Sequence, residues 1–227
     1  MERFEKLINL VGKDKFNKLK NSNVIVFGLG GVGGYVVEGL VRSGIGCITL
    51  VDFDVVEPSN INRQIIALES TVGESKTMVM KQRVLQINPK CQVTTINEKI
   101  DAKNIDKIVF KKFDYVIDAI DMVTSKIAII KKAKECGANI ISCMGTGNKL
   151  DIKALEIVDI EKTSVCPLAK VIRKLLRQEG IKEVDVLYSK ETPKANIVEK
   201  RPQSAIFVPA VAGLMIANFV IKKLMGL

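Results

Sequence analysis

The chain has 227 residues, of which 47% are hydrophobic and 26% charged, a composition that suits a globular protein with one large domain or two small ones. It contains no histidine, which excludes a Ser-His-Asp triad, a histidine general base and any histidine-ligated metal. The formal net charge of +10 favours a polyanionic partner such as nucleic acid, although a solvated basic enzyme surface fits it as well.

The cysteines are scattered and odd in number, and none of them forms a CxxC pair: they are Cys47, Cys91, Cys136, Cys143 and Cys166. No zinc site is therefore expected, and free thiols of this kind suit a reducing, cytoplasmic compartment. The first ten residues mix charges with apolar side chains, so no secretory signal is expected.

The chain is organised around a strand, a glycine turn, a helix and a second strand. Short amphipathic helices are expected over 3–10 and 15–20, followed by an apolar strand over 24–27. That strand runs directly into GLGGVG, and the second strand, over 47–51, runs directly into an aspartate. Asp52 follows Gly33 by 19 residues, the spacing at which a dinucleotide-type fold places its ribose-binding carboxylate.

Each glycine of the turn has a separate expected role. Gly28 permits the tight turn, Gly30 and Gly31 leave no side chain between backbone and phosphate, and Gly33 lets the helix pack against the strand. The partial positive charge of the helix N-terminus faces the phosphates. The pattern predicts binding of a ligand with an adenosine and phosphates.

Strands and helices continue to alternate as far as residue 147. Strands are expected over 91–96, 113–119 and 140–143, helices over 76–87 and 124–136, and a short helix over 105–110. This order predicts an α/β, Rossmann-like fold whose mostly parallel sheet is covered by helices on both faces. We expect a single domain over 1–227, with a nucleotide-binding core over 1–150 and a smaller α+β extension for substrate binding and dimerisation over 151–227.

The extension is expected to hold strands over 154–159 and 184–188, a helix over 167–178 and a mobile segment over 190–202. Residues 203–221 carry no charge, a length sufficient for a membrane span. Polar residues within it, including Gln203 and Asn218, favour instead a strand over 205–208 and a fully buried helix over 209–224. We expect no membrane span, and the buried helix is a candidate subunit interface.

Several charged residues are expected at the same edge of the sheet as the glycine turn. Asp54 shares a sheet face with Asp52, and Asn60 and Arg63 follow in a polar loop. Lys76 begins a helix, where a cation opposes the helix dipole unless a phosphate is near. Asp121 follows a strand end and is placed to hold a metal. Together these residues suit a triphosphate.

Each of these charged residues also has a purely structural alternative. Arg63 could form a salt bridge with Asp54, Lys76 could be a solvated helix residue, and Asp121 could cap a helix.

The motifs GLGGVGG, DFDVVEPSNINRQ, VGESK and DAID resemble those of the ATP-dependent adenylating family that includes ThiF, MoeB, HesA and the ubiquitin-activating enzymes. The resemblance covers residues 21–147. It implies ATP as cofactor, with Mg²⁺ held through Asp121 and the phosphates, and a homodimer in which Arg3 reaches the phosphates of the neighbouring subunit. The nucleotide residues that it implies are Gly31, Asp52, Asn60, Arg63, Lys76 and Asp121.

The second half, with GTGNKLD, DIEKTSVCPLAKVIR and FVPAVAGL, resembles the tRNA threonylcarbamoyladenosine dehydratase branch of that family. The resemblance implies adenylation of the threonyl carboxylate of the modified adenosine, followed by ring closure to an oxazolone with loss of AMP. Lys170, Arg173, Lys174 and Arg177 recur at spacings of three and four and share one helix face. That face either follows the tRNA backbone or is simply solvated.

Two other functions stay open. One is an activator of a ubiquitin-like or sulfur-carrier protein, in which Cys166, placed just before a helix that begins with proline, would form a thioester. Against it, the chain lacks the CxxC pairs that such activators often use to bind zinc. The other is a non-catalytic, NAD-binding Rossmann module, which would not need Arg63 and Lys76.

Overall fold

The computed structural model describes residues 2–194 and 202–227, and a seven-stranded sheet in the order β3-β2-β1-β4-β5-β7-β6 forms its centre. Neighbouring strands run parallel except for β6 and β7, which are antiparallel. The strands are β1 (Asn23–Phe27), β2 (Cys47–Val51), β3 (Gln92–Ile96), β4 (Tyr115–Asp118), β5 (Ile140–Cys143), β6 (Leu155–Asp159) and β7 (Asp185–Ser189). The predicted Rossmann-like, mostly parallel sheet is confirmed.

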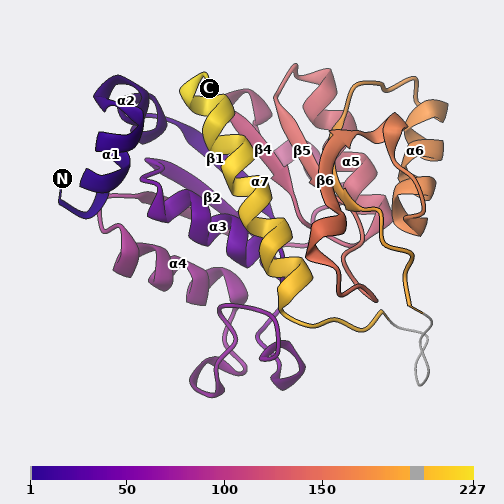
Figure 1. The fold of residues 1–227 in the computed structure, drawn as a ribbon, viewed down its shortest axis with the longest axis horizontal. Coiled ribbons are helices and arrows are strands. Elements are labelled where there is room, and N and C mark those ends of the chain that lie inside the picture. Colours follow the sequence, from indigo (N-terminus) through magenta and orange to yellow (C-terminus); the bar gives the residue numbers. More distant parts are fainter. Residues whose placement is uncertain (1, 195–201) are drawn as a thin grey trace.

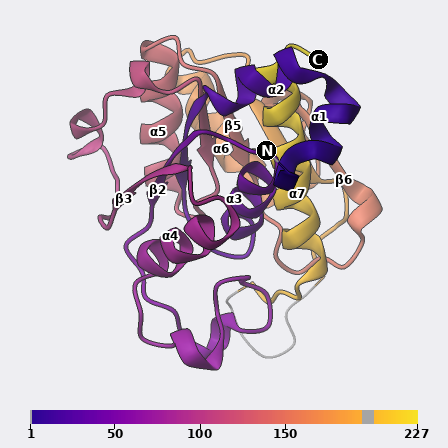
Figure 2. The ribbon, with the colours of Figure 1, turned by 90° about the vertical axis from the view of Figure 1, so that its left-hand side faces the viewer.

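Helices cover both faces of this sheet, because its strands are apolar on both sides. In β1, Val24 and Val26 belong to one core cluster, whereas Ile25 and Phe27 belong to the other, as the alternation of side chains along a strand requires. Figure 1 shows α7 crossing in front of the sheet beside α3, and Figure 2 shows the sheet between α5 and the pair α3 and α7. The helices are α1 (Glu5–Val11), α2 (Lys13–Lys20), α3 (Gly33–Arg42), α4 (Lys76–Ile87), α5 (Val123–Glu135), α6 (Pro167–Gln178) and α7 (Phe207–Met225).

The C-terminal helix differs from its prediction in two ways. The predicted strand over 205–208 is wrong, because α7 already begins at Phe207. Proline is tolerated in a first helical turn, where its missing N–H needs no partner, so Pro209 does not delay the helix. The helix is also not fully buried: Phe207 is 65% exposed and Leu214 47%.

One face of α7 packs closely on α3. A Cβ on Gly213 would lie 2.4 Å from the carbonyl oxygen of Val32, and one on Gly39 would lie 2.6 Å from the Cβ of Ala217. The helix is long and apolar enough to cross a bilayer, but half of its apolar window is buried inside the protein, which is also what a core helix shows. Its packing on α3 agrees with the core-helix interpretation.

Two smaller predictions also change. The short helix expected over 105–110 is replaced by two 3₁₀ turns, Ile105–Lys107 and Phe110–Lys112. The segment expected to be mobile, 190–202, lies partly outside the described residues, which omit 195–201. The strands of the expected extension, β6 and β7, continue the same sheet beyond β5.

The strand order creates the place for a ligand. β1 lies between β2 and β4, so the chain leaves β1 toward one neighbour and returns later to the other. In open parallel sheets of this kind, ligands bind outside the carboxyl ends of the strands where the order reverses. The glycine turn after β1, Asp52 after β2 and the turn after β4 all meet at that edge.

Candidate active site

A cavity of about 660 Å³ opens at the carboxyl edge of the sheet. The loops that follow β1, β2, β4 and β5 all contribute to its wall, and so does the first residue of α4. It brings together nearly all of the predicted nucleotide residues, namely Gly28, Gly30, Gly31, Asp52, Asp54, Asn60, Arg63, Lys76 and Asp121. A cavity of this size is typical of a cofactor site.

The glycine turn has the geometry expected from its sequence. Gly28 has φ +86°, and a Cβ there would lie 2.8 Å from the carbonyl oxygen of Ala119. A Cβ on Gly33 would lie 1.8 Å from the carbonyl oxygen of Gly28, so α3 packs directly against the turn and no larger residue fits. At Gly30 the nearest atom would be 3.9 Å away, the side-chain Nε2 of Gln64. Gly30 therefore leaves open space on the cavity side.

Asp52 joins the glycine turn to the end of β2. One carboxylate oxygen accepts a hydrogen bond from the backbone N–H of Leu29 at 2.6 Å, and the other accepts from the N–H of Asp54 at 2.9 Å. The residue is only 8% exposed. Because each carboxylate oxygen has a second acceptor position, Asp52 is held in place and still able to accept ribose hydroxyls.

The two cations of the cavity have different partners from those considered in the sequence. Lys76 is buried, at 6% exposure, and its Nζ lies 2.9 Å from a carboxylate oxygen of Asp54, so the solvated alternative for Lys76 is wrong. Arg63 instead donates to the carbonyl oxygen of Ser59 at 2.8 Å and to the side-chain oxygen of Asn62 at 2.9 Å. The alternative in which Arg63 pairs with Asp54 is therefore also wrong.

Asp121 lies in the exposed turn between β4 and α5 and lines the cavity. The residue at the N-cap of α5 is Met122, so the capping alternative for Asp121 is not what the structure shows. Asp118, the last residue of β4, fixes this turn, because its carboxylate accepts a hydrogen bond from the backbone N–H of Ile120 at 3.1 Å. The carboxylate of Asp121 is therefore presented on an ordered turn beside the glycine loop.

Gln64 lines the cavity but was not among the predicted nucleotide residues. It is 6% exposed, and within the described residues its side-chain oxygen is buried without a hydrogen-bond partner. A buried amide without a partner is costly, and a ligand in the cavity would supply one. The only sequence signal for Gln64 was its position directly after Arg63 in the polar loop.

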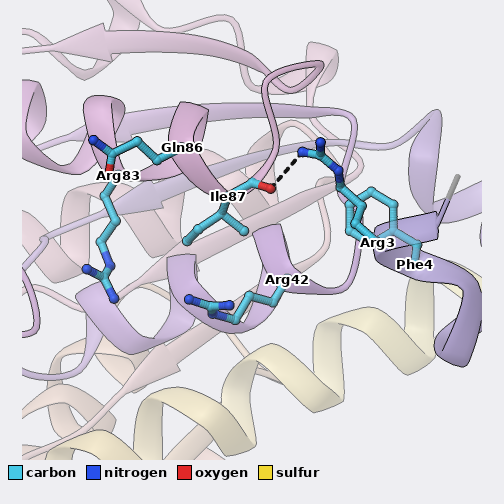
Figure 3. Close-up of a pocket in the computed structure, with 6 residues that line it drawn as sticks. All are labelled: Arg3, Phe4, Arg42, Arg83, Gln86 and Ile87. Atoms are coloured by element: carbon cyan, nitrogen blue, oxygen red, sulfur yellow. Dashed lines mark hydrogen bonds between the residues drawn. The ribbon is translucent and has the colours of Figure 1, made fainter.

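Arg3 does not reach the cavity of its own chain. It lines a separate hollow of about 430 Å³ together with Phe4, Arg42, Arg83, Gln86 and Ile87. Its guanidinium donates to the carbonyl oxygen of Ile87 at 2.9 Å (Figure 3). Its predicted role toward a neighbouring subunit stays a prediction.

The predicted basic face of α6 is less available than its spacing indicates. Lys170 and Lys174 are exposed. Arg173 donates to the carbonyl oxygen of Thr163 at 2.9 Å, and Arg177 forms an ion pair with Glu161. The two arginines are therefore occupied within the chain, and only the two lysines present free charge.

The cysteines near the cavity are poorly suited to nucleophilic chemistry. Cys143 lines the cavity, but burial raises the pKa of its thiol to about 12, so it stays protonated at neutral pH. Cys166 occupies the N-cap of α6 and is 3% exposed, which shields it from a protein-sized partner.

These features define a class of protein: a doubly wound nucleotide-binding domain whose cavity combines a glycine turn, a ribose-type carboxylate and two cations. The profile of the ThiF family matches residues 4–227. A protein of Bacillus subtilis named tRNA threonylcarbamoyladenosine dehydratase is 40% identical over 95% of this chain and 91% of its own length. The Escherichia coli protein of the same name is 36% identical over 78% of this chain and 66% of its own.

A solved structure supports the same conclusion. The Escherichia coli tRNA N6-threonylcarbamoyladenosine dehydratase TcdA, in complex with AMP, superimposes with a TM-score of 0.94 at 33% identity, covering 99% of this chain and 94% of that one. The same enzyme has also been solved in complex with ATP. The chain belongs to the ThiF family, as the resemblance of its motifs predicted.

Proposed function

We propose that this chain is an ATP-dependent enzyme that adenylates the threonyl carboxylate of threonylcarbamoyladenosine in tRNA and releases the cyclised, dehydrated nucleoside. The observation that carries the proposal is the 40% identity to the B. subtilis dehydratase over 95% of this chain. It is supported by a cavity whose glycine turn and cations suit ATP.

The reaction requires two displacements. A carboxylate oxygen of the substrate attacks the α-phosphorus of ATP, and the bond to pyrophosphate breaks. A nucleophile within the substrate then attacks the activated carbonyl, AMP leaves, and the oxazolone ring closes with a net loss of one water. Neither step needs an enzyme thiol or a histidine.

The chain contributes position and charge. The backbone at Gly30 and Gly31 lies where phosphates approach the start of α3, and Asp52 holds the ribose. Arg63 and Lys76 neutralise the charge that develops on the phosphates. Lys76 is only 6% exposed, and a charge held away from bulk solvent contributes more to this stabilisation. Lys76 is already oriented by Asp54, so little reorganisation is needed when ATP binds.

The cavity suits a magnesium ion that arrives with ATP. Among residues 2–194 and 202–227, no three His, Cys, Asp or Glu side chains gather into a metal site. Mg²⁺ at nucleotides is commonly held by one or two carboxylates together with substrate phosphates and water, so Asp121 would hold it. When bound, the ion would supply positive charge between the phosphates.

We further infer a homodimer that acts on tRNA in the cytoplasm. The exposed apolar residues of α7, Phe207 and Leu214, are candidates for the subunit contact, and Arg3 is a candidate for a contact with the phosphates of the other subunit. Lys170 and Lys174 are candidates for contact with tRNA.

An activator of a carrier protein is the second candidate. A yeast adenylyltransferase and sulfurtransferase, UBA4, is 36% identical, but over only 61% of this chain and 31% of its own length. The shared part indicates common adenylation chemistry, whereas the relatives that match along the whole chain are named dehydratases.

Mass spectrometry of nucleosides tests the proposal directly. Modified tRNA incubated with enzyme, ATP and Mg²⁺ should lose one water mass from threonylcarbamoyladenosine, and Asp121→Ala should abolish the change. Unchanged tRNA, together with AMP formation from a carrier protein ending in Gly-Gly, would assign the chain to the other branch. Calorimetric titration with ATP and with NAD distinguishes the dehydratase and the carrier-protein activator, which would both bind ATP, from an NAD-binding module, which would bind NAD and not ATP.

A further inference from the structure

One part of the cavity wall is not explained by the predicted nucleotide residues. It comes from the loop after β5, the start of α6 and the segment that leads into α7. We call it the uncharged wall and define it by Gly145, Thr146, Gly147, Leu168, Pro202 and Ser204. None of these side chains is ionisable, whereas the nucleotide residues include Asp52, Arg63 and Lys76. The two parts of the cavity therefore suit different ligands.

A wall without charge suits a nucleoside better than a phosphate. Phosphates are bound by cations and charge-assisted donors, which the other part of the cavity supplies. The faces of a nucleobase are apolar, and an enzyme that modifies a base takes it out of the stack and holds it between apolar side chains. Leu168 and Pro202 present such surfaces in the cavity. Thr146 and Ser204 add hydroxyl groups, which can donate or accept hydrogen bonds at the edge of the base.

Asn148 joins the two chain segments of the uncharged wall. Its backbone N–H donates to the carbonyl oxygen of Gln203 at 2.7 Å, and its side-chain Oδ1 accepts from the backbone N–H of the same residue at 2.7 Å. Asn148 has φ +60°, a conformation that asparagine adopts more readily than most residues. The pairing brings the two segments together so closely that a Cβ on Gly147 would lie 2.8 Å from the Cβ of Pro202.

The next residue ties the same loop to the sheet. Lys149 is 3% exposed, and its Nζ donates to the carbonyl oxygens of Gly145 at 3.1 Å and Ser189 at 3.3 Å. Ser189 is the last residue of β7, so the loop after β5 has a fixed position on the sheet. The position of residues 202–204 over the cavity therefore depends on their pairing with Asn148.

Residues 202–204 are also connected to a cation of the nucleotide part. Nδ2 of Asn62 donates to the carbonyl oxygen of Ser204 at 2.8 Å, and Oδ1 of Asn62 accepts from Nη1 of Arg63 at 2.9 Å. A series of hydrogen bonds thus runs from Asn148 through residues 203–204 to Asn62 and Arg63. It holds the uncharged wall in a defined position relative to Arg63, as a reaction between two bound ligands requires.

We propose that the uncharged wall binds the tRNA nucleoside that carries the threonylcarbamoyl group, and that Asn148 is the positioning residue that sets this wall relative to Arg63. This inference rests on the proposed function, because it takes the modified nucleoside as the substrate. With the base on the uncharged wall and the phosphates of ATP at Arg63 and Lys76, the threonyl carboxylate extends from one part of the cavity toward the other. Asn148 acts on the nucleoside through residues 202–204.

Steady-state AMP release at saturating ATP, with the concentration of modified tRNA varied, tests this role. Asn148→Gly removes the side chain, and glycine adopts φ +60° without strain, so the variant should keep its fold. Its kcat/KM for tRNA should fall about tenfold, chiefly through a higher KM, as expected for one lost hydrogen bond that orders the wall. Its dissociation constant for ATP, measured by calorimetry, should stay at the wild-type value.

Two further variants complete the experiment. Asn148→Asp keeps an acceptor for the N–H of Gln203 and tolerates the same φ, so it should recover most of the lost kcat/KM. Asn139→Ala is the matched control, because it removes a side-chain hydrogen bond, to the carbonyl oxygen of Asp114 at 3.1 Å, at the other end of β5. It should leave the kinetics with tRNA unchanged.

Three outcomes overturn the proposal. The first is that Asn148→Gly matches Asn139→Ala in kcat/KM for tRNA. The second is that Asn148→Gly weakens ATP binding as much as it raises the KM for tRNA, which would assign the loop to the nucleotide or to the fold as a whole. The third is that Asn148→Asp loses as much as Asn148→Gly while both unfold at the wild-type temperature. Failure of the proposed function is visible separately, because wild-type enzyme would then form no dehydrated nucleoside.

Discussion

Lys126 and Asp118 form an ion pair with no exposure at all: Nζ lies 2.9 Å from a carboxylate oxygen, and both side chains are 0% exposed. Ser142 on β5 completes the cluster, since its hydroxyl donates to the same carboxylate oxygen at 2.6 Å and accepts from Lys126 at 3.1 Å. The other oxygen of Asp118 holds the turn that leads to Asp121. The cluster therefore fixes the turn after β4 that places Asp121 in the wall of the cavity.

Removing one partner of this pair should be far more harmful than removing both charges. Lys126→Met leaves an uncompensated buried carboxylate and should lower the free energy of unfolding by about 3–5 kcal/mol. Adding Asp118→Asn to Lys126→Met should restore much of that loss. Urea denaturation measures both, with Lys131→Met on the exposed side of the same helix as control. A loss no larger than the control's would contradict the role assigned to the pair.

Gly30 and Gly33 should respond oppositely to alanine. Gly33→Ala places a Cβ 1.8 Å from the carbonyl oxygen of Gly28, so the variant should fail to reach the native fold. Gly30→Ala has no atom nearer than 3.9 Å and should unfold at the wild-type temperature. Its methyl group would separate phosphate from backbone, and ATP affinity should fall about tenfold, or ~1.4 kcal/mol. Thermal unfolding and calorimetric ATP titration distinguish the two effects, and normal ATP binding by Gly30→Ala would count against this position of the phosphates.

Lys76→Ala should reduce turnover at least about tenfold, because a hydrogen bond to a charged group is worth roughly 1.5–3 kcal/mol. The measurement is AMP release in the presence of ATP and modified tRNA. Lys90→Ala, an exposed lysine in the turn after α4, is the control. Full activity of Lys76→Ala would show that its role is limited to the ion pair with Asp54.

Glu38 should stabilise the protein in a pH-dependent way. Its pKa is lowered from 4.5 because the hydrogen bonds from Arg83 and Arg42 outweigh the effect of burial. A carboxyl group with a lowered folded-state pKa contributes its stability above the unfolded pKa and loses it as pH falls through the folded one. At pH 7, Glu38→Gln should therefore be less stable than wild type by about 1.5–3 kcal/mol.

The difference between Glu38→Gln and wild type should shrink progressively below pH 4.5. Chemical denaturation at a series of pH values measures it, and Glu135→Gln on the surface of α5 serves as control. A gap that is constant across pH would mean that packing, rather than charge, accounts for the effect.

Cys166→Ala should retain AMP release near the wild-type rate. The ring closes through a nucleophile within the substrate, and the thiol is buried at the start of α6. The assay is ATP- and tRNA-dependent AMP release with folding checked by circular dichroism. Complete loss of activity in a folded variant would favour a thioester-forming carrier activator.

Local patterns were sufficient to predict most strands and helices of the fold. The strand over 47–51, the strand over 140–143 and the helices over 76–87 and 167–178 occur with the predicted bounds, because apolar periodicity and flanking glycine, proline or polar residues define them. Where such signals conflict, as at Val208 and Pro209, an apolar run of β-type composition became the first turn of a helix.

Pairings between distant residues could not be read from the sequence. Asp54 is 22 residues from Lys76 and only nine from Arg63, yet its partner is Lys76. The choice depends on where α4 begins relative to the end of β2, which is a property of the assembled sheet. The convergence of Arg3, Arg42 and Arg83 has the same origin, since no spacing along the chain relates their three elements.

The packing of α7 on α3 has a consequence for synthesis. About 165 residues separate the end of α3 at Arg42 from the start of α7 at Phe207. At the usual elongation rates of about 5–20 residues per second, α7 is therefore synthesised roughly 8–30 s after α3, and the apolar face of α3 lacks its packing partner during that time. During that interval the emerging chain lacks the helix that packs against Val36 and Gly39. A nascent chain of this protein therefore keeps an apolar surface uncovered until α7 has left the exit tunnel.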